Sequence, residues 1–206
     1  TWNGLHQLVR LDLDTDTPDG IFSDAEGFSR AQYCGDGSGT IRFSGGRLAA
    51  RPELVSHQAL WTIDEVDGTP DTPLIQGGDR EITHDSWLGS SREIVFVQCE
   101  EPHPAEAYPS SIRAVNVDTG YVRLIADRGS YWHCSASPDG RLIISDTNWP
   151  QRGLILIDTR TGQERTLCWP GESGGARVWG HPHPSFSPDG TKVLYNSDVT
   201  GISQLY

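Results

Sequence analysis

A polar turn followed by a short strand recurs along this chain, and this repeat constrains the fold more than any other feature. The segment SPDGRLIIS at Ser137 returns as SPDGTKVLY at Ser187, about 50 residues later. Weaker copies, LGSSREIVF and GDGSGTIRF, begin at Leu88 and Gly35. Each turn is rich in Gly, Asp and Ser and precedes a β-branched and aromatic run, as in a hairpin that enters a strand.

A second element recurs between these turns. The segments LVRLDLDT, LWTIDEVDG, RAVNVDTG and LILIDTRTG begin at Leu8, Leu60, Arg113 and Leu154. They alternate apolar and polar residues and end in an Asp/Thr/Gly turn, which predicts half-buried antiparallel strands. Several short strands in each unit of about 40 to 50 residues are typical of a β-propeller blade.

We therefore predict an all-β fold in which residues 1–206 form a single β-propeller region with about four blades. A β-sandwich of similar strand density is the alternative, but a sandwich gives no reason for the repeat to keep its register. Propellers commonly close with up to about eight blades. The chain shows only about four repeat units, so we favour the interpretation that it is a piece of a longer ring over a ring that closes with few blades. The last residues, SQLY from Ser203, also read as a strand cut short.

Composition and charge exclude several partners. The formal net charge is -12 and the basic residues are scattered, so we expect no nucleic acid and no anionic membrane as a partner. No apolar run is long enough to span a membrane, and the first residues show no signal peptide. The cysteines stand far apart without a CxxC pair, so we expect buried thiols and leave a disulfide open. They are Cys34, Cys99, Cys134 and Cys168.

Three histidines occupy one position of the repeat. His133 and His183 each lie four residues before the serine of an SPDG turn. Aligning Arg92 with Arg141 places His84 at the same position. The strand before such a hairpin is usually the innermost strand of a propeller blade, so we expect these side chains to converge on the central channel.

The segment HPHPSFSPDG adds a fourth histidine to this group. His181 lies two residues before His183 and points to the same side of an extended strand, which Pro182 and Pro184 favour. Grouped histidines can bind a divalent metal or supply a general base. The plainer interpretation is that each histidine only hydrogen-bonds a neighbouring blade, but a group of four favours a site. The remaining histidines share no repeat position: His6, His57 and His103.

With these motifs in place, the chain resembles the oligogalacturonate lyases, propellers that cleave short pectin fragments by β-elimination. HPHPSF followed by a turn and the strand YNSDVTG is the specific part of the resemblance, whereas SPDG turns occur in many propellers. Further support comes from AQYCGDGSGTIRF, THDSWLGSS and YWHCSASPDG. The resemblance implies a seven-bladed ring, of which this chain is the C-terminal half, and a cytoplasmic protein.

The resemblance also implies a site. His133, His181 and His183 would bind a divalent metal of the manganese type, and His84 of THDSW would be the catalytic base. The activity implied is that of a carbon-oxygen lyase that acts on a small uronic-acid oligosaccharide. A metal on the uronate carboxylate would make the C5 proton removable.

Two positions depart from the family pattern. The family has a glutamine ligand where this chain has Val178, and an arginine where it has Ala59. Two alternatives therefore stand beside the lyase: a propeller that binds a metal or a uronate without catalysis, and a scaffold propeller of the SPDG-repeat type. Other arginines that could replace the missing one are Arg51, Arg152 and Arg177.

Overall fold

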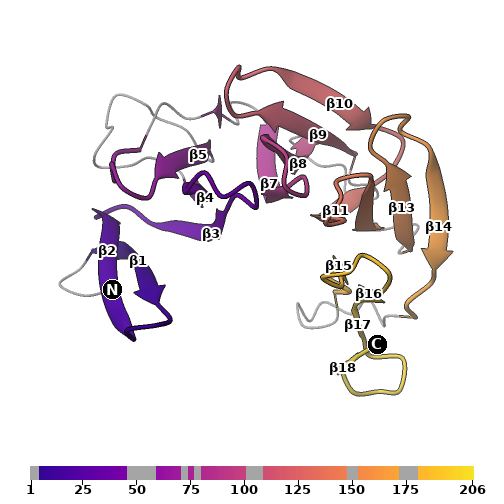
Figure 1. Ribbon diagram of the computed structural model, residues 1–206. Coiled ribbons are helices and arrows are strands. Elements are labelled where there is room, and N and C mark those ends of the chain that lie inside the picture. Colours follow the sequence, from indigo (N-terminus) through magenta and orange to yellow (C-terminus); the bar gives the residue numbers. More distant parts are fainter. Residues whose placement is uncertain are drawn as a thin grey trace. The chain divides into compact units, whose positions relative to one another are not determined.

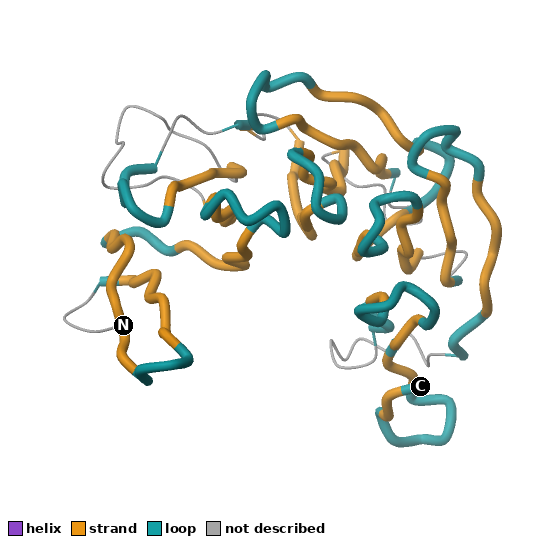
Figure 2. The backbone as a smooth tube through the Cα atoms, in the orientation of Figure 1, coloured by secondary structure: helices purple, strands orange, loops and turns teal. Residues whose placement is uncertain are grey.

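The computed structural model describes residues 5–45, 59–70, 74–76, 80–100, 109–147, 153–171 and 181–206. Throughout these ranges the regular structure consists of strands, without a helix (Figures 1 and 2). In the same ranges, no helix has the length and apolar character needed to cross a membrane. The predicted all-β class is confirmed.

Three four-stranded antiparallel sheets form the main architecture of the described chain. In each sheet the strands pair in the order in which they follow along the chain, as in a propeller blade. The first sheet contains β3 (Phe28–Tyr33), β4 (Thr40–Gly45), β5 (Ala59–Asp64) and β6 (Ile75–Gln76). The second contains β7 (Arg80–Trp87), β8 (Glu93–Glu100), β9 (Ser110–Asn116) and β10 (Val122–Ala126). The third contains β11 (Tyr131–Ala136), β12 (Leu142–Thr147), β13 (Leu154–Asp158) and β14 (Glu164–Cys168).

Shorter strand pairs precede and follow these sheets. The first pair is β1 (His6–Asp12) with β2 (Thr17–Asp24). Near the other end, β15 (Ser185–Phe186) pairs with β16 (Val193–Leu194), and β17 (Asn196–Ser197) pairs with β18 (Gln204–Leu205). The described chain divides into two compact units, Thr1–Ile82 and Thr83–Tyr206. The expectation of a single propeller region stays a prediction.

An aromatic cluster forms the core of the first unit. Phe43 of β4 and Trp61 of β5 are fully buried, and their rings stack with centroids 6.3 Å apart. Phe22 and Phe28 pack on Phe43, with ring centroids 5.9 and 5.5 Å from it. Burial of such rings stabilises the unit through the apolar area that is removed from water.

The core of the second unit is aliphatic. In β8, the run from Ile94 to Val97 is buried along its whole length, because β8 is an interior strand with neighbours on both sides. Ile112 of β9 and Ile143 of β12 join the same core. The four cysteines are thiols, and three of them are buried: Cys34, Cys99 and Cys134.

The two recurring sequence elements become two kinds of turn. In the SPDG turns, the amide N–H of Ser137 donates to the carbonyl of Leu142 at 2.8 Å, and that of Ser187 donates to Lys192 at 2.9 Å. In the Asp/Thr/Gly turns, a side-chain oxygen at the strand end accepts from the following backbone amides. These acceptors are Asp12, Asp64, Asn116 and Asp158.

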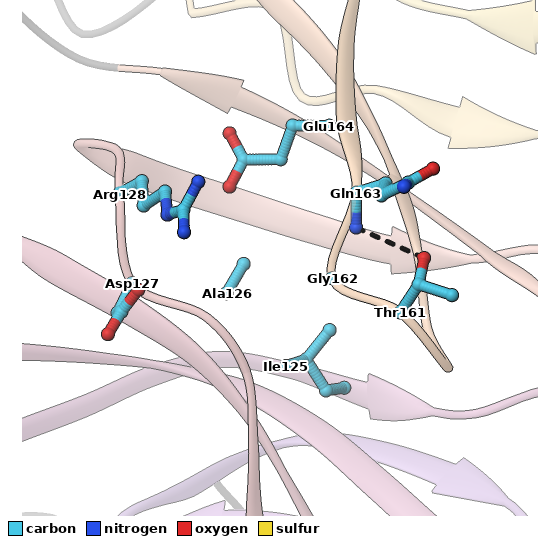
Figure 3. A pocket seen from close by; sticks show the side chains of 8 residues that line it. All are labelled: Ile125, Ala126, Asp127, Arg128, Thr161, Gly162, Gln163 and Glu164. Carbon is cyan, nitrogen blue, oxygen red and sulfur yellow. Dashed lines mark hydrogen bonds between the residues drawn. The ribbon is translucent and has the colours of Figure 1, made fainter.

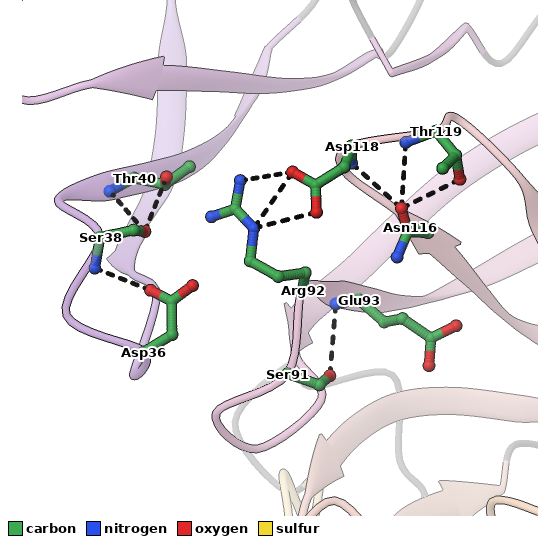
Figure 4. A network of polar contacts seen from close by, with 9 residues as sticks. All are labelled: Asp36, Ser38, Thr40, Ser91, Arg92, Glu93, Asn116, Asp118 and Thr119. Carbon is green, nitrogen blue, oxygen red and sulfur yellow. Dashed lines mark hydrogen bonds and ion pairs between the residues drawn. The ribbon is translucent and has the colours of Figure 1, made fainter.

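Charged side chains join successive turns within a sheet. Arg92, the last residue of the turn before β8, donates to Asp118 in the turn after β9, with Nη2 2.8 Å from Oδ1 (Figure 4). The same turn is closed by Asn116, which accepts from the amides of Asp118 and Thr119 at 3.1 and 3.0 Å. The pair Arg92–Asp118 is partly exposed, so we assign it a small contribution to stability.

Candidate metal and catalytic site

His84 lies near the end of β7, where the backbone is strained. Its φ is 51°, which is uncommon for a residue with a side chain. The His84 carbonyl accepts a hydrogen bond from the thiol of Cys134, whose Sγ lies 2.9 Å away. Cys134 belongs to β11 of the next sheet, so a buried group of one sheet holds the backbone of the other.

His133 lies at a bulge in β11. Tyr131 pairs with Thr147 and Cys134 with Ser145, so β11 has one residue more than β12 over this stretch. A bulge of this kind bends the strand and changes the direction of its side chains. The extra residue places His133 against Asp146.

Asp146, at the end of β12, makes three contacts with histidines. Its Oδ1 accepts from the backbone N–H of His133 at 2.6 Å, and its Oδ2 lies 2.7 Å from Nδ1 of the same ring. Oδ2 also accepts from the backbone N–H of His183 at 3.2 Å. Asp146 and His133 are both buried, at 2% and 7% exposure. Since a carboxylate only accepts, the His133 ring donates through Nδ1, and in the neutral tautomer that donates there the lone pair is on Nε2.

The segment that carries the other two histidines precedes β15. Pro182 and Pro184 are buried, whereas His181 is half-buried and His183 is exposed. The carbonyl of Pro182 accepts from the amide of Asn196 at 2.8 Å, which ties this segment to β17. His183 has a φ of 43°, so the strained backbone seen at His84 recurs here.

The structure brings the four predicted site residues together in the second unit. Each of three histidines contributes one ring nitrogen to a group in which all nitrogens lie within 4.8 Å of one another. These residues are His133, His181 and His183. The ring of His84 lies beside this group, with its centroid 4.2 Å from that of His133. The arrangement offers three imidazole ligands and one neighbouring imidazole. The role of each residue stays a prediction.

Sequence reasoning missed three residues around the cluster. Trp132, next to His133 in the bulge, has its ring centroid 5.4 Å from that of His84 and 6.2 Å from that of His181. Asp146 and Cys134 were also not predicted. The repeat contained a signal for Asp146, because Asn196 holds the equivalent place nine residues after the turn serine and also contacts the HPHP segment.

A separate pocket of about 560 Å³ lies between the end of β10 and the turn that joins β13 to β14 (Figure 3). Figure 3 shows the Arg128 guanidinium and the Glu164 carboxylate directed toward each other across it. Glu164 also accepts a hydrogen bond from the hydroxyl of Tyr131, and burial together with this bond raises the pKa of Tyr131. None of the four histidines lines this pocket.

Two further sequence candidates lie within the described residues, both in the first unit. His6, in the first unit, has its ring 6.2 Å from that of Phe28. Ala59, at which the resemblance implies an arginine, is buried at the start of β5. The remaining candidates lie outside the described residues: Arg51, His57, His103, Arg152, Arg177 and Val178.

Known proteins resemble this chain in sequence. It is 25% identical over 222 aligned residues to an oligogalacturonide lyase of Pectobacterium atrosepticum, and 23% identical over 220 residues to an oligogalacturonate lyase of Dickeya dadantii. Both alignments cover 97% of this chain and 54% of the relative. The resemblance to the oligogalacturonate lyases is confirmed. No protein-family model matches the chain.

Solved structures agree on the fold. An oligogalacturonate lyase in complex with manganese has a TM-score of 0.77 at 23% identity, over 97% of this chain and 52% of its own. The oligogalacturonate lyase of Vibrio parahaemolyticus has a TM-score of 0.76 at 20% identity. The match covers 98% of this chain and 54% of that structure. TolB of Acinetobacter baumannii gives a TM-score of 0.61 at 18% identity, over 94% of this chain and 43% of its own. The predicted β-propeller fold is confirmed. The chain spans about half the length of the lyase relatives.

Proposed function

We propose that this chain is part of a lyase that cleaves uronic-acid oligosaccharides by metal-assisted β-elimination. The observation that carries the proposal is the histidine cluster. Three imidazoles offer nitrogens within 4.8 Å of one another, and a fourth ring lies 4.2 Å from one of them. The similarity to oligogalacturonate lyases supplies the substrate class.

The residues present fit a divalent metal ion. Imidazole nitrogens suit divalent first-row metals, and three ligands leave positions for water and substrate oxygens. Asp146 contacts Nδ1 of His133, and metal-bound histidines typically donate their second ring N–H to a carboxylate in this way. We propose manganese because the related lyase structure was solved with it.

The bound metal would act as a Lewis acid on the uronate carboxylate and favour negative charge at C5. His84 takes the proton from C5. The C5–H electrons then form the C4=C5 double bond while the C4–O4 bond breaks. The departing O4 takes a proton from water, and the product is a 4,5-unsaturated uronate.

His84 is proposed as the base because a metal-bound imidazole has no lone pair to accept a proton. It is absent from the group of three ligands, yet its ring is adjacent to that group. The hydrogen bond from Cys134 to the His84 carbonyl holds its backbone at the strained φ. Fixed placement of a base beside the substrate is a large part of general base catalysis.

One observation favours a second candidate, a propeller that binds a metal or a uronate without turnover. Ala59 is buried and apolar at the position where the family carries an arginine. An arginine there would stabilise the developing enolate, and removal of such a group typically costs about 3 to 4 kcal/mol of transition-state stabilisation. Without a replacement for this charge, binding would persist while the rate falls.

The full-length protein, stripped of metal with a chelator, separates these candidates. Mn²⁺ binding is measured by titration, and elimination is measured by the absorbance of the unsaturated uronate from an oligogalacturonide. Metal binding with product formation supports the lyase, and metal binding without product supports the non-catalytic binder. Failure to bind Mn²⁺, Zn²⁺ or Co²⁺, together with failure to bind the oligogalacturonide, would leave only the scaffold propeller.

A further inference from the structure

We propose that Asp146 is a positioning residue that fixes two metal ligands from different parts of the chain in one arrangement. This inference rests on the proposed metal centre and adds the residue that assembles it. Asp146 is not itself one of the three ligands. It acts on His133 through the ring and the backbone, and on His183 through the backbone.

The contact with His133 selects a tautomer. Oδ2 of Asp146 lies 2.7 Å from Nδ1, while Oδ1 holds the backbone N–H of the same residue at 2.6 Å. Two bonds from one carboxylate fix both the position of the residue and the orientation of its ring. With the proton on Nδ1, the Nε2 lone pair is available to a metal without prior rearrangement.

The contact with His183 fixes the second ligand. The backbone N–H of His183 lies 3.2 Å from the same Oδ2, although the two residues are 37 positions apart. His183 is exposed and has a strained φ of 43°, so its own burial cannot hold it. A buried carboxylate at this point offsets part of the strain and brings the HPHP segment to β12.

Substitution by asparagine keeps the size of the side chain and changes both contacts of Oδ2, because an amide nitrogen at that place accepts neither from the His133 ring nor from the backbone N–H of His183. In Asp146→Asn the carbonyl oxygen can still accept the backbone N–H of His133. The amide nitrogen would then face Nδ1 of the ring, and a donor there requires Nδ1 to accept. The proton would move to Nε2, which removes the lone pair that the metal needs.

We therefore expect Asp146→Asn to weaken Mn²⁺ binding by about 10- to 100-fold, the usual effect of losing such a partner. Binding is measured by isothermal titration of Mn²⁺ into the chelator-stripped full-length protein. The matched control is Asp24→Asn, another aspartate that is buried, at 3% exposure, but lies in the first unit. Asp24→Asn should keep the wild-type affinity. Circular dichroism of the metal-free proteins establishes that the variants are folded.

A second measurement tests the inference on the wild-type protein itself and is then repeated on Asp146→Asn. In the metal-free wild-type protein, ¹⁵N chemical shifts of the His133 ring should show the proton on Nδ1, and in Asp146→Asn they should show it on Nε2. A proton on Nε2 of the wild-type ring would overturn the inference even if the variant failed to fold.

The outcomes also separate this inference from the proposed function. If wild-type protein binds Mn²⁺ and Asp146→Asn binds it equally well, the positioning role is wrong and the metal centre stands. If wild-type protein binds no divalent metal, both are wrong. Equal losses in Asp146→Asn and Asp24→Asn would contradict a specific role for Asp146.

Discussion

At the scale of single residues, strained backbone marks one position of the inner strands. Positive φ occurs at Arg30, His84 and His183, each four residues before the first residue of a hairpin turn. The strain therefore recurs in three copies of this repeat position, at two histidines and one arginine. His133 occupies the same position without positive φ, and there Asp146 holds the residue instead.

Cys134→Ala tests whether the thiol positions the base. Loss of the hydrogen bond to the His84 carbonyl should loosen a strained backbone, so we expect kcat to fall several-fold with little change in KM. The Mn²⁺ affinity should stay within about twofold, because Cys134 is not among the ligands. Cys99→Ala removes another buried thiol from the same core and should leave kcat unchanged. An equal fall of kcat in both variants would indicate a general packing effect.

The histidine cluster could be predicted from sequence because a repeat assigns equivalent residues to equivalent places. His84, His133 and His183 share one position before a hairpin turn, and His181 was predicted from its spacing to His183. Trp132 and Cys134 could not be found in this way. Their placement depends on a bulge and on packing between sheets, neither of which leaves a periodic pattern.

At the scale of elements, the SPDG turns are stabilised by an ionised aspartate. Hydrogen bonds from Ser187 and from the amide and hydroxyl of Thr191 lower the pKa of Asp189 from 3.8 to about 2. Asp139, in the preceding copy of the turn, has its pKa lowered by Ser137 and by the amide of Arg141. The repeat thus preserves an electrostatic feature as well as a turn shape.

This shift predicts how Asp189 affects stability with pH. Because the folded pKa is lower than the unfolded one, the ionised group stabilises the fold above about pH 4. That contribution is lost as the pH falls from about 4 toward 2. Thermal unfolding of wild-type and Asp189→Asn proteins should therefore differ most at neutral pH and converge at low pH. A difference in melting temperature that is constant from pH 7 to pH 2.5 would contradict the assignment.

Gly89→Ala tests the packing between two hairpin turns. A Cβ at Gly89 would lie 2.6 Å from the carbonyl oxygen of Pro138, and the φ of +60° also disfavours alanine. We expect a loss of about 1 to 3 kcal/mol in the free energy of unfolding, measured by denaturant titration. Gly120→Ala is the control, because Gly120 has a φ of +68° but open space around it. Equal losses would show that backbone strain alone is responsible.

The recurring strand patterns were predicted better than the remaining elements. The alternating segments that begin at Leu8, Leu60, Arg113 and Leu154 correspond to β1, β5, β9 and β13. By contrast, the outer strand β14 is exposed along most of its length and has no distinct pattern of burial. Its pairing with β13 follows from the turn between them and from the sheet, so the sequence carried little signal for it.

At the scale of the whole molecule, metal binding should be linked to stability. A ligand that binds only the folded state stabilises it by about 2.7 kcal/mol when its free concentration is 100 times Kd. Mn²⁺ should therefore raise the melting temperature of the chelator-stripped full-length protein by several degrees, and a chelator should reverse the shift. His183→Ala should lose the shift, whereas His6→Ala should keep it. A shift of the same size in both variants would place the metal elsewhere.

The fold of the whole molecule could be predicted because the repeat recurs with a constant register, which gives the same sheet each time. The number of blades in the complete ring stays a prediction, since the chain spans about half the length of its lyase relatives. The proposed substrate class rests on the family resemblance and not on the repeat. The spacing of the histidines predicts that they lie together but does not specify a ligand.

The central claim is that one histidine acts as a base beside three that hold the metal. The most direct test compares His84→Ala with wild-type full-length protein in two measurements, Mn²⁺ affinity and formation of the unsaturated uronate. We predict that the affinity stays within about twofold while kcat falls by about 100-fold or more. Loss of Mn²⁺ binding in His84→Ala, or an unchanged rate of elimination, would contradict the assignment.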